Sequence, residues 1–255
     1  MQSNSKWVSN CPALVLAGGF GKRLRTCYDD GPKVLAPVGG QSFLEYLLLW
    51  LNESGIKRVI LCIGYKGAQL RESLGDGHKF GLEVDYSSED IPLGTAGALK
   101  HAERLVDSDS FFAMNGDSFL DVNLRAMYYQ HHSNSAFATL AVTPMSYFDR
   151  YGSVELNSKE EIVGFTEKTA AHECEPKVRA RTLINGGVYL LQKSFLELIP
   201  AGKAVSIERD IFPCLTDGRL RGFVTESYFI DIGIPADYNR AQAELPRRFQ
   251  YDHTS

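Results

Sequence analysis

The stretch LVLAGGFGKRLRTCYDDGPKVLAPVGG, residues 14–40, decides the fold of this 255-residue chain. It begins with an apolar run at 14–17 that is typical of a buried strand. The chain then becomes a loop rich in glycine and in cationic side chains: Gly18, Gly19, Gly21, Lys22, Arg23, Arg25 and Lys33. Glycines let backbone N–H groups approach a ligand closely, and neighbouring cations attract anions. The stretch therefore predicts either an anion-binding loop after the first strand or a glycine-rich turn with solvated cations.

Two common phosphate-binding loops do not fit these residues. A P-loop needs Ser or Thr after its Gly-Lys pair, but Arg23 follows Gly21 and Lys22. A dinucleotide-binding GxGxxG loop needs glycines at other spacings, and position 24 is Leu24. An anion-binding loop of a third kind remains.

The pattern outside the loop predicts an α/β protein. Apolar strands at 13–17, 58–64, 82–87 and 111–115 alternate with helical stretches at 42–55, 67–74 and 95–106. This alternation predicts a parallel sheet covered on both faces. Further strands follow at 137–145, 151–156, 162–168, 184–191 and 222–230. We expect a Rossmann-like three-layer sandwich with a mixed, mostly parallel central sheet.

The sequence shows no linker, so we expect one domain at 13–245 between tails at 1–12 and 246–255. The formal net charge of −4 argues against a non-specific nucleic-acid binder. Five scattered cysteines indicate neither a disulfide framework nor a zinc site. No secretory leader or run of about 20 apolar residues stands out, so we expect a cytoplasmic protein that does not bind a membrane.

Two aspartates follow apolar runs that are far apart in the sequence. Asp117 comes after the strand at 111–115, and Asp231 lies in the sequence IDIG. In an open parallel sheet, ligands bind at the carboxyl ends of the strands. Carboxylates at such an edge are able to hold Mg²⁺, which prefers oxygen ligands. The structural alternative for each aspartate alone is a side chain that caps its own loop.

Several motifs, taken in order, resemble sugar-1-phosphate nucleotidyltransferases. The first is LAGGFGKRLR followed by GPKVLAPVGGQSFLEY, which is similar to the GG-x-G-x-R-L loop and P-K pair of that family. Later pieces are SEDIPLGTAGAL (88–99), NGDSFLD (115–121), FDRYGSVEL (148–156), FTEK (165–168), INGGVYLL (184–191) and FIDIGIPADY (229–238). The resemblance spans about 13–240. The FDRYG stretch and the short chain favour a guanylyltransferase branch over the thymidylyl and uridylyl branches that act on glucose 1-phosphate.

The resemblance implies transfer of a nucleotide from an NTP to a sugar 1-phosphate, with Mg²⁺ as cofactor. The catalytic residues would be Arg23, Lys33 and Asp117. The nucleotide would contact Leu16, Ala17, Gly18, Gly19, Gly21, Arg23, Lys33, Glu89, Gly94 and Thr95. The sugar phosphate would contact Gly152, Glu167, Lys168 and Asn185, and the metal would be held by Asp117 and Asp231.

Glu89 stands where the family places a side chain that recognises the base. A carboxylate offers only acceptors, whereas guanine presents two neighbouring N–H donors on its Watson–Crick edge. Glu89 therefore favours GTP, unless it is only a solvated loop carboxylate.

The expected product is a GDP-sugar for capsule or lipopolysaccharide synthesis. The enzyme alternative is a nucleotidyltransferase with another pairing of base and sugar, either a mannose 1-phosphate guanylyltransferase or a uridylyltransferase for an amino sugar. The alternative from another class is a non-catalytic relative that binds nucleotide sugars. The resemblance allows a homodimer, although no exposed apolar stripe in the sequence indicates one.

Overall fold

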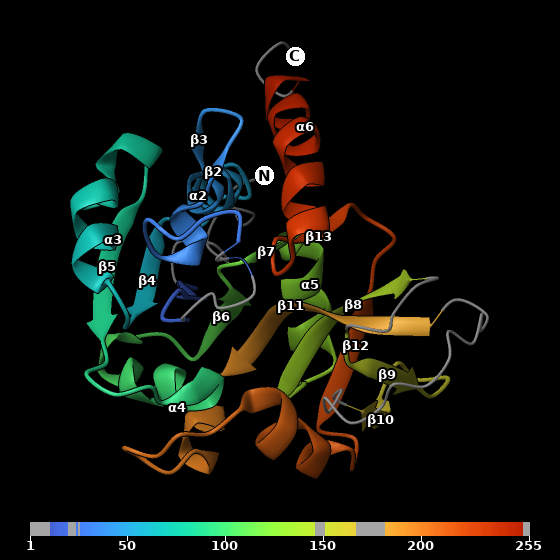
Figure 1. Cartoon of the computed structure of the whole chain (residues 1–255). Coiled ribbons are helices and arrows are strands. Elements are labelled where there is room, and N and C mark those ends of the chain that lie inside the picture. The colour runs from blue at the N-terminus through green and yellow to red at the C-terminus, as the bar shows by residue number, and fades with distance from the viewer. Residues whose placement is uncertain (1–10, 20–23, 25, 146–150, 167–181, 252–255) are drawn as a thin grey trace, which may run out of the picture.

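A large mixed sheet forms the centre of the protein (Figure 1). The computed structural model describes residues 11–19, 24, 26–145, 151–166 and 182–251. The strands of the sheet are β1 (Ala13–Leu16), β4 (Arg58–Ile63), β5 (Glu83–Ser88), β6 (Ser110–Asn115), β8 (Ala138–Met145), β9 (Ser153–Leu156), β10 (Ile162–Thr166), β11 (Thr182–Gln192) and β12 (Leu220–Val224). Their order is β10-β9-β11-β6-β1-β4-β5, and β8 lies between β11 and β12.

The first half of the chain forms the parallel part of the sheet. β1 pairs in parallel with β4 and β6, and β4 pairs in parallel with β5. β11 then joins β6 in the antiparallel direction. The expected α/β fold with a mixed, mostly parallel sheet is therefore confirmed.

Helices cover both faces of the sheet. The α-helices are α2 (Phe43–Glu53), α3 (Gly67–Leu74), α4 (Gly94–His101), α5 (Leu124–Ser133) and α6 (Pro235–Tyr251). The shorter helical turns are η2 (Lys33–Leu35), η3 (His78–Phe80), η4 (Glu103–Leu105), η5 (Lys193–Leu198), η6 (Ile207–Ile211) and η7 (Phe212–Leu215). Side chains of α2, α3, α5 and α6 pack on one face, and those of α4 and of residues 195–215 pack on the other. The connections after β1 and before β6 thus cross opposite faces, which makes the carboxyl end of β1 a topological switch point.

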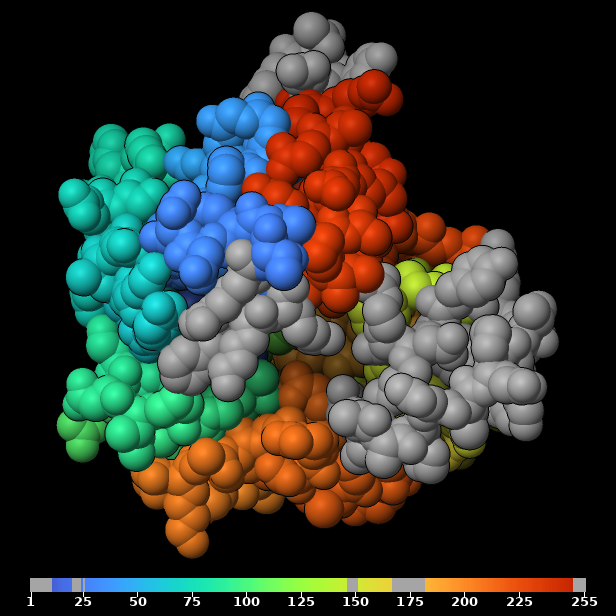
Figure 2. All heavy atoms as spheres, viewed as in Figure 1, coloured from blue at the N-terminus to red at the C-terminus, as the bar shows by residue number. Residues whose placement is uncertain are grey.

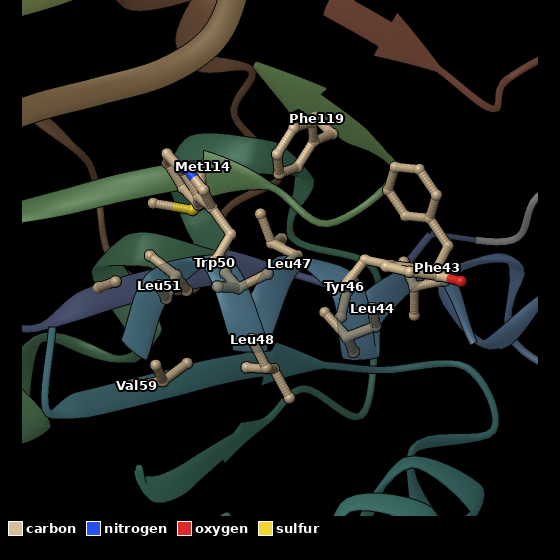
Figure 3. Close-up of a cluster of buried hydrophobic side chains, with 14 of the residues drawn as sticks. Phe43, Leu44, Tyr46, Leu47, Leu48, Trp50, Leu51, Val59, Met114 and Phe119 are labelled. Carbon is tan, nitrogen blue, oxygen red and sulfur yellow. The ribbon is translucent and has the colours of Figure 1, made fainter. Parts of the chain in front are cut away.

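α2 shows how local sequence fixes an element beside the site. Ser42 and Glu45 form a capping box at its first turn, in which the Ser42 N–H donates to the Glu45 carboxylate at 2.7 Å. The apolar face of the helix clusters with Val59 of β4 and Met114 of β6, as Figure 3 shows for Leu48 and Leu51. This packing anchors the chain that leaves the cationic loop.

The expected strand at 222–230 is two strands in different sheets. β12 ends at Val224, and β13 (Phe229–Asp231) pairs antiparallel with β7 (Ser118–Leu120) in a separate two-stranded ribbon. Between them the Ser227 N–H donates to Oγ1 of Thr225 at 3.3 Å, a side-chain turn that ends the first strand. The break carries Asp231 away from β8 and toward the turn after β6.

The final helix packs against the hairpin of β2 (Pro37–Val38) and β3 (Gln41–Ser42), beside it in Figures 1 and 2. The Pro37 carbonyl accepts from the Tyr238 hydroxyl at 2.6 Å and from Nε2 of Gln242 at 2.8 Å. α6 continues beyond residue 245, where the sequence suggested a tail, and Phe249 is buried against the Tyr46 ring at 5.1 Å. Within the described segments, no helix is long and apolar enough to span a bilayer.

Candidate active site

A cavity of about 350 Å³ opens at the carboxyl end of β1. It is lined by Leu16, Gly18, Gly19, Lys33, Val34, Cys62, Glu89, Pro92, Gly94, Thr95, Ala98, Asn115, Asp117 and Gly233. Most of the described residues expected to contact the nucleotide therefore meet at one cavity, together with residues that the sequence did not single out.

One end of the cavity holds a lysine between two carboxylates. Nζ of Lys33 lies 2.7 Å from Oδ2 of Asp117 and 3.7 Å from Oδ1 of Asp231. The Lys33 side chain is 10% exposed and the Asp117 side chain 41%, so the lysine is confined while the carboxylate remains open to the cavity. This end of the cavity thus combines one cation with a pair of oxygen ligands.

The ribbon of β7 and β13 sets the position of both carboxylates. Asp231 pairs with Ser118 across the ribbon, and the Ile232 N–H donates to the Asp117 carbonyl at 3.1 Å. The Gly116 N–H donates to the Leu16 carbonyl at 2.9 Å, which ties the turn to the end of β1. The two acidic residues therefore converge because of backbone pairing, and the convergence does not depend on side-chain rotamers alone.

Glu89 lies at another part of the cavity, beyond β5. Its Oε2 accepts a hydrogen bond of 3.2 Å from the Leu93 N–H. A Cβ placed on either Gly18 or Gly64 would come within 3.0 Å of its Oε1, so two glycines leave the space that this carboxylate occupies. Burial raises the pKa of Glu89, while the Leu93 N–H and His101 oppose the shift.

Gly152 and Asn185 come together on a different part of the sheet. The Asn185 N–H donates to the Gly152 carbonyl at 3.2 Å. Nδ2 of Asn185 donates to the Tyr189 hydroxyl at 2.9 Å, and its Oδ1 accepts from the Gly187 N–H at 3.0 Å. Neither Gly152 nor Asn185 lines the cavity described above.

Some expected contact residues have other positions. Ala17 is buried, and its N–H donates to the Cys62 carbonyl at 2.9 Å, so it supports the loop from behind. Gly21, Arg23, Glu167 and Lys168 lie outside the described residues.

The sequence analysis missed residues that shape the cavity. Asn115 stands opposite Leu16 in the pairing of β1 with β6, and it lies in the NGD motif. Gly187 has a φ of 73°, and a Cβ there would lie 2.8 Å from Nδ2 of Asn115. The paired glycines of INGGVY were the available signal, because they mark a strand that bulges toward a close neighbour.

The family model described as nucleotidyl transferase matches residues 12–248 of this chain. The chain belongs to the nucleotidyl transferase family. The match covers β1, the cavity and almost all of α6, so the enzyme class applies to the whole described fold.

Relatives of this nucleotidyltransferase include guanylyltransferases. The chain is 39% identical to a D-glycero-alpha-D-manno-heptose 1-phosphate guanylyltransferase of Aneurinibacillus thermoaerophilus, over 91% of this chain and 97% of that protein. It is 35% identical to a mannose-1-phosphate guanylyltransferase of Mycobacterium tuberculosis, over 92% of this chain but 64% of that protein. A crystal structure of HddC from Yersinia pseudotuberculosis complexed with GMP-PN matches with a TM-score of 0.80 at 31% identity, covering 92% of this chain and 99% of that chain.

The geometry of this nucleotidyltransferase separates two chemical environments around one cavity. Lys33 and the two aspartates bring charge to one part, and the Glu89 carboxylate brings only acceptors to another. A ligand with an anionic end and a donor-bearing end matches that division, and a nucleoside triphosphate has both.

Proposed function

We propose that this chain is a D-glycero-α-D-manno-heptose 1-phosphate guanylyltransferase. It transfers GMP from GTP to the sugar 1-phosphate, giving the GDP-heptose and pyrophosphate. Support comes from the near full-length similarity to the Aneurinibacillus enzyme and from the acceptor-only side chain in the cavity. The nucleotide sugar would supply heptose for capsule or lipopolysaccharide.

The observation that carries the choice of base is the fixed Glu89 carboxylate. The Leu93 N–H holds one oxygen at 3.2 Å, and the other lies against Gly18 and Gly64. Guanine offers N1–H and N2–H side by side to such a carboxylate, whereas uracil and thymine present one donor between two acceptors. A site built to accept two hydrogen bonds discriminates strongly against a base that lacks one of the donors.

The reaction needs two anions to be held together in line. An oxygen of the sugar 1-phosphate attacks the α-phosphorus of GTP, the bond to the bridging oxygen breaks, and pyrophosphate leaves. Lys33 would neutralise charge that grows on the α-phosphate, and backbone N–H groups at Gly18 and Gly19 would hold phosphate oxygens. Arg23 is assigned to the β- and γ-phosphates by the family motif. No covalent enzyme intermediate is required.

The two carboxylates fit the Mg²⁺ that the family implies. Asp117 and Asp231 already lie within 4 Å of one cation, Nζ of Lys33, so their oxygens face a common point. No group of three or more His, Cys, Asp or Glu residues that would form a closed metal cage occurs among residues that the structure describes. An open pair suits Mg²⁺, which keeps waters and binds phosphate oxygens. When bound, the ion would neutralise phosphate charge.

The sugar 1-phosphate would bind near Gly152 and Asn185, with Glu167 and Lys168 as further contacts from the family motif. Asn185 carries a carboxamide that is able to face a sugar hydroxyl. The second candidate acceptor is mannose 1-phosphate, which the similarity to the mycobacterial enzyme favours.

A pyrophosphate-release assay tests the function. GTP, ATP, UTP and dTTP are each paired with heptose 1-phosphate and with mannose 1-phosphate in the presence of Mg²⁺. We expect the highest kcat/KM with GTP and heptose 1-phosphate. Faster turnover of mannose 1-phosphate would transfer the assignment to the second candidate, and release with UTP but not GTP would contradict the role of Glu89. If no pair of substrates releases pyrophosphate, the proposed enzymatic activity is wrong.

A further inference from the structure

Glu208 joins two parts of the molecule that the proposed reaction must bring together. It lies on η6, in the orange segment below α4 and β11 in Figure 1. Its Oε2 accepts from Oγ1 of Thr95 at 2.8 Å, and its Oε1 accepts from the Tyr189 hydroxyl at 3.3 Å. The Ser206 hydroxyl also donates to Oε2, at 2.9 Å. Each oxygen of this one carboxylate is therefore bound to a different strand or helix of the fold.

The first connection fixes the helix beside the cavity. Thr95 gives its hydroxyl proton to Glu208, and its oxygen accepts from the Ile207 N–H at 2.8 Å. The Val205 carbonyl accepts from the Ala96 N–H at 3.0 Å, so the first turn of α4 is docked on residues 205–208. The Thr95 hydroxyl proton is committed inside the protein, which makes Thr95 a support of the cavity wall more than a donor to a nucleotide.

The second connection reaches the residue proposed for the sugar. The Tyr189 hydroxyl donates to Glu208 and accepts from Nδ2 of Asn185 at 2.9 Å. The Tyr189 ring is fully buried and lies 5.1 Å from the Phe212 ring, edge to face. A buried ring has little freedom to move, so the hydroxyl holds the Asn185 carboxamide in one orientation.

We propose that Glu208 is a positioning residue that couples the nucleotide subsite to the sugar-phosphate subsite, an inference that rests on the proposed function. A carboxylate accepts hydrogen bonds with both oxygens, and such charge-assisted bonds are about twice as strong as neutral ones. Removal of the charge leaves Thr95 and Tyr189 without a shared acceptor. Both subsites then lose their fixed geometry at once.

Binding calorimetry of the full chain tests this coupling. The ligands are α,β-methylene-GTP, which cannot transfer GMP, and mannose 1-phosphate or heptose 1-phosphate, each titrated separately with Mg²⁺ present. Glu208→Gln keeps the shape but replaces one acceptor oxygen with a donor group. We expect it to weaken both ligands by about tenfold, the loss of one charge-assisted hydrogen bond.

Variants of the two partners separate the connections. Thr95→Val should weaken only the nucleotide analogue, and Tyr189→Phe should weaken only the sugar phosphate. Thr95→Ser keeps the hydroxyl, so its affinity for the nucleotide analogue should stay within about twofold of that of the wild type. Glu197→Gln makes the same charge change at an exposed position and should leave both affinities unchanged. If Glu208→Gln does not fold, the opposite selectivity of the two partner variants still tests the proposal.

Two results would overturn the coupling. One is a Glu208→Gln protein that binds both ligands within twofold of the wild type. The other is a Glu208→Leu protein, which has neither acceptor oxygen, that loses only one ligand, because Glu208 would then serve a single subsite. A wrong choice of nucleotide in the proposed function would give a different result, because the wild-type protein would then bind α,β-methylene-UTP more tightly than α,β-methylene-GTP. The coupling would in that case be tested with the same variants and α,β-methylene-UTP.

Discussion

Nζ of Lys33 donates a hydrogen bond of 2.7 Å to Oδ2 of Asp117, although 84 positions separate the two residues. Asp231 approaches the same ammonium group from a third segment, at 3.7 Å. A confined cation between two carboxylates is the feature on which the proposed phosphate chemistry depends.

Lys33→Met should reduce kcat by about 10²–10³, because it removes the donor that we propose acts on the charge developing on the α-phosphate. The GTP affinity should change far less, since other groups hold the nucleotide. Steady-state kinetics checks both values, with exposed Lys193→Met as the matched control. If Lys33→Met keeps kcat within threefold of the wild type, Lys33 has no role in the chemical step.

Asp117→Asn and Asp231→Asn should each abolish turnover, since an amide in place of one carboxylate removes charge that the proposed Mg²⁺ site requires. Titration of Mg²⁺ in the presence of α,β-methylene-GTP should show weaker metal binding in both variants. Asp109→Asn changes an exposed carboxylate and should behave as the wild type. Undiminished Mg²⁺ binding in both site variants would rule out the proposed metal pair.

The pKa of Glu89 is raised by burial, and this predicts two opposite effects of acid. As the pH falls through the raised pKa, the carboxylate takes a proton, and GTP affinity should fall with the lost acceptor. The folded state binds that proton more tightly than the unfolded chain, so Glu89 contributes stability at low pH that is lost as the pH rises. Binding and urea unfolding across the acidic range measure both effects, and Glu89→Gln should remove both.

Gly187→Ala should lower the free energy of unfolding and the turnover together. The residue has a φ of 73°, and an added Cβ would lie 2.8 Å from Nδ2 of Asn115 and 2.9 Å from Oγ of Ser118, on either side of Asp117. Gly202 has a φ of 70° with nothing within 4 Å of an added Cβ. Gly202→Ala should therefore show only the cost of a left-handed backbone, about 1–2 kcal/mol, with normal kcat. Equal losses of stability in the two variants would refute the steric argument.

His131 should destabilise the fold in acid. It is 1% exposed, its Nδ1 lies 2.8 Å from Oγ1 of Thr139, and its Nε2 has no hydrogen-bond partner among the described residues. Burial, with a smaller effect of His132, lowers its pKa from 6.5 to about 4. The unfolded chain therefore binds the extra proton first, and about 3 kcal/mol of stability is lost as the pH falls from 6.5 to 4.

Urea unfolding between pH 7 and 4 measures the loss due to His131. His131→Gln removes the titrating group and should flatten the pH dependence, whereas exposed His78→Gln should not. A wild-type curve with the same slope as His131→Gln would contradict the assignment.

The fold was largely predictable because its signals are local. The apolar run of β1, the Ser42 and Glu45 cap of α2 and the alternation of strands with helices all follow from short-range preferences. The break between β12 and β13 was not predictable in this way. Residues 222–230 favour a strand throughout, and only the Thr225 turn and the pairing of β13 with β7 separate them.

The cavity was predictable where a topological rule applies to it. Glu89 and Asp117 follow strands whose carboxyl ends meet at one edge, and that edge is known once the strands are parallel. Glu208 follows no such strand, and 113 positions separate it from Thr95. Its contacts depend on how residues 193–215 pack against α4, and the periodicity of the sequence does not predict that packing.

The ribbon of β7 and β13 determines which changes of chain length the site tolerates. Side chains alternate between the faces of a strand, so a shift by one residue would turn Asp231 away from Lys33. Single-residue insertions inside the ribbon should inactivate the enzyme even where they leave it folded. Added residues at 225–227, in the turn between β12 and β13, lengthen a connection without shifting that register. Length variation among functional variants should therefore concentrate in the turn and be excluded from the three paired positions on either strand.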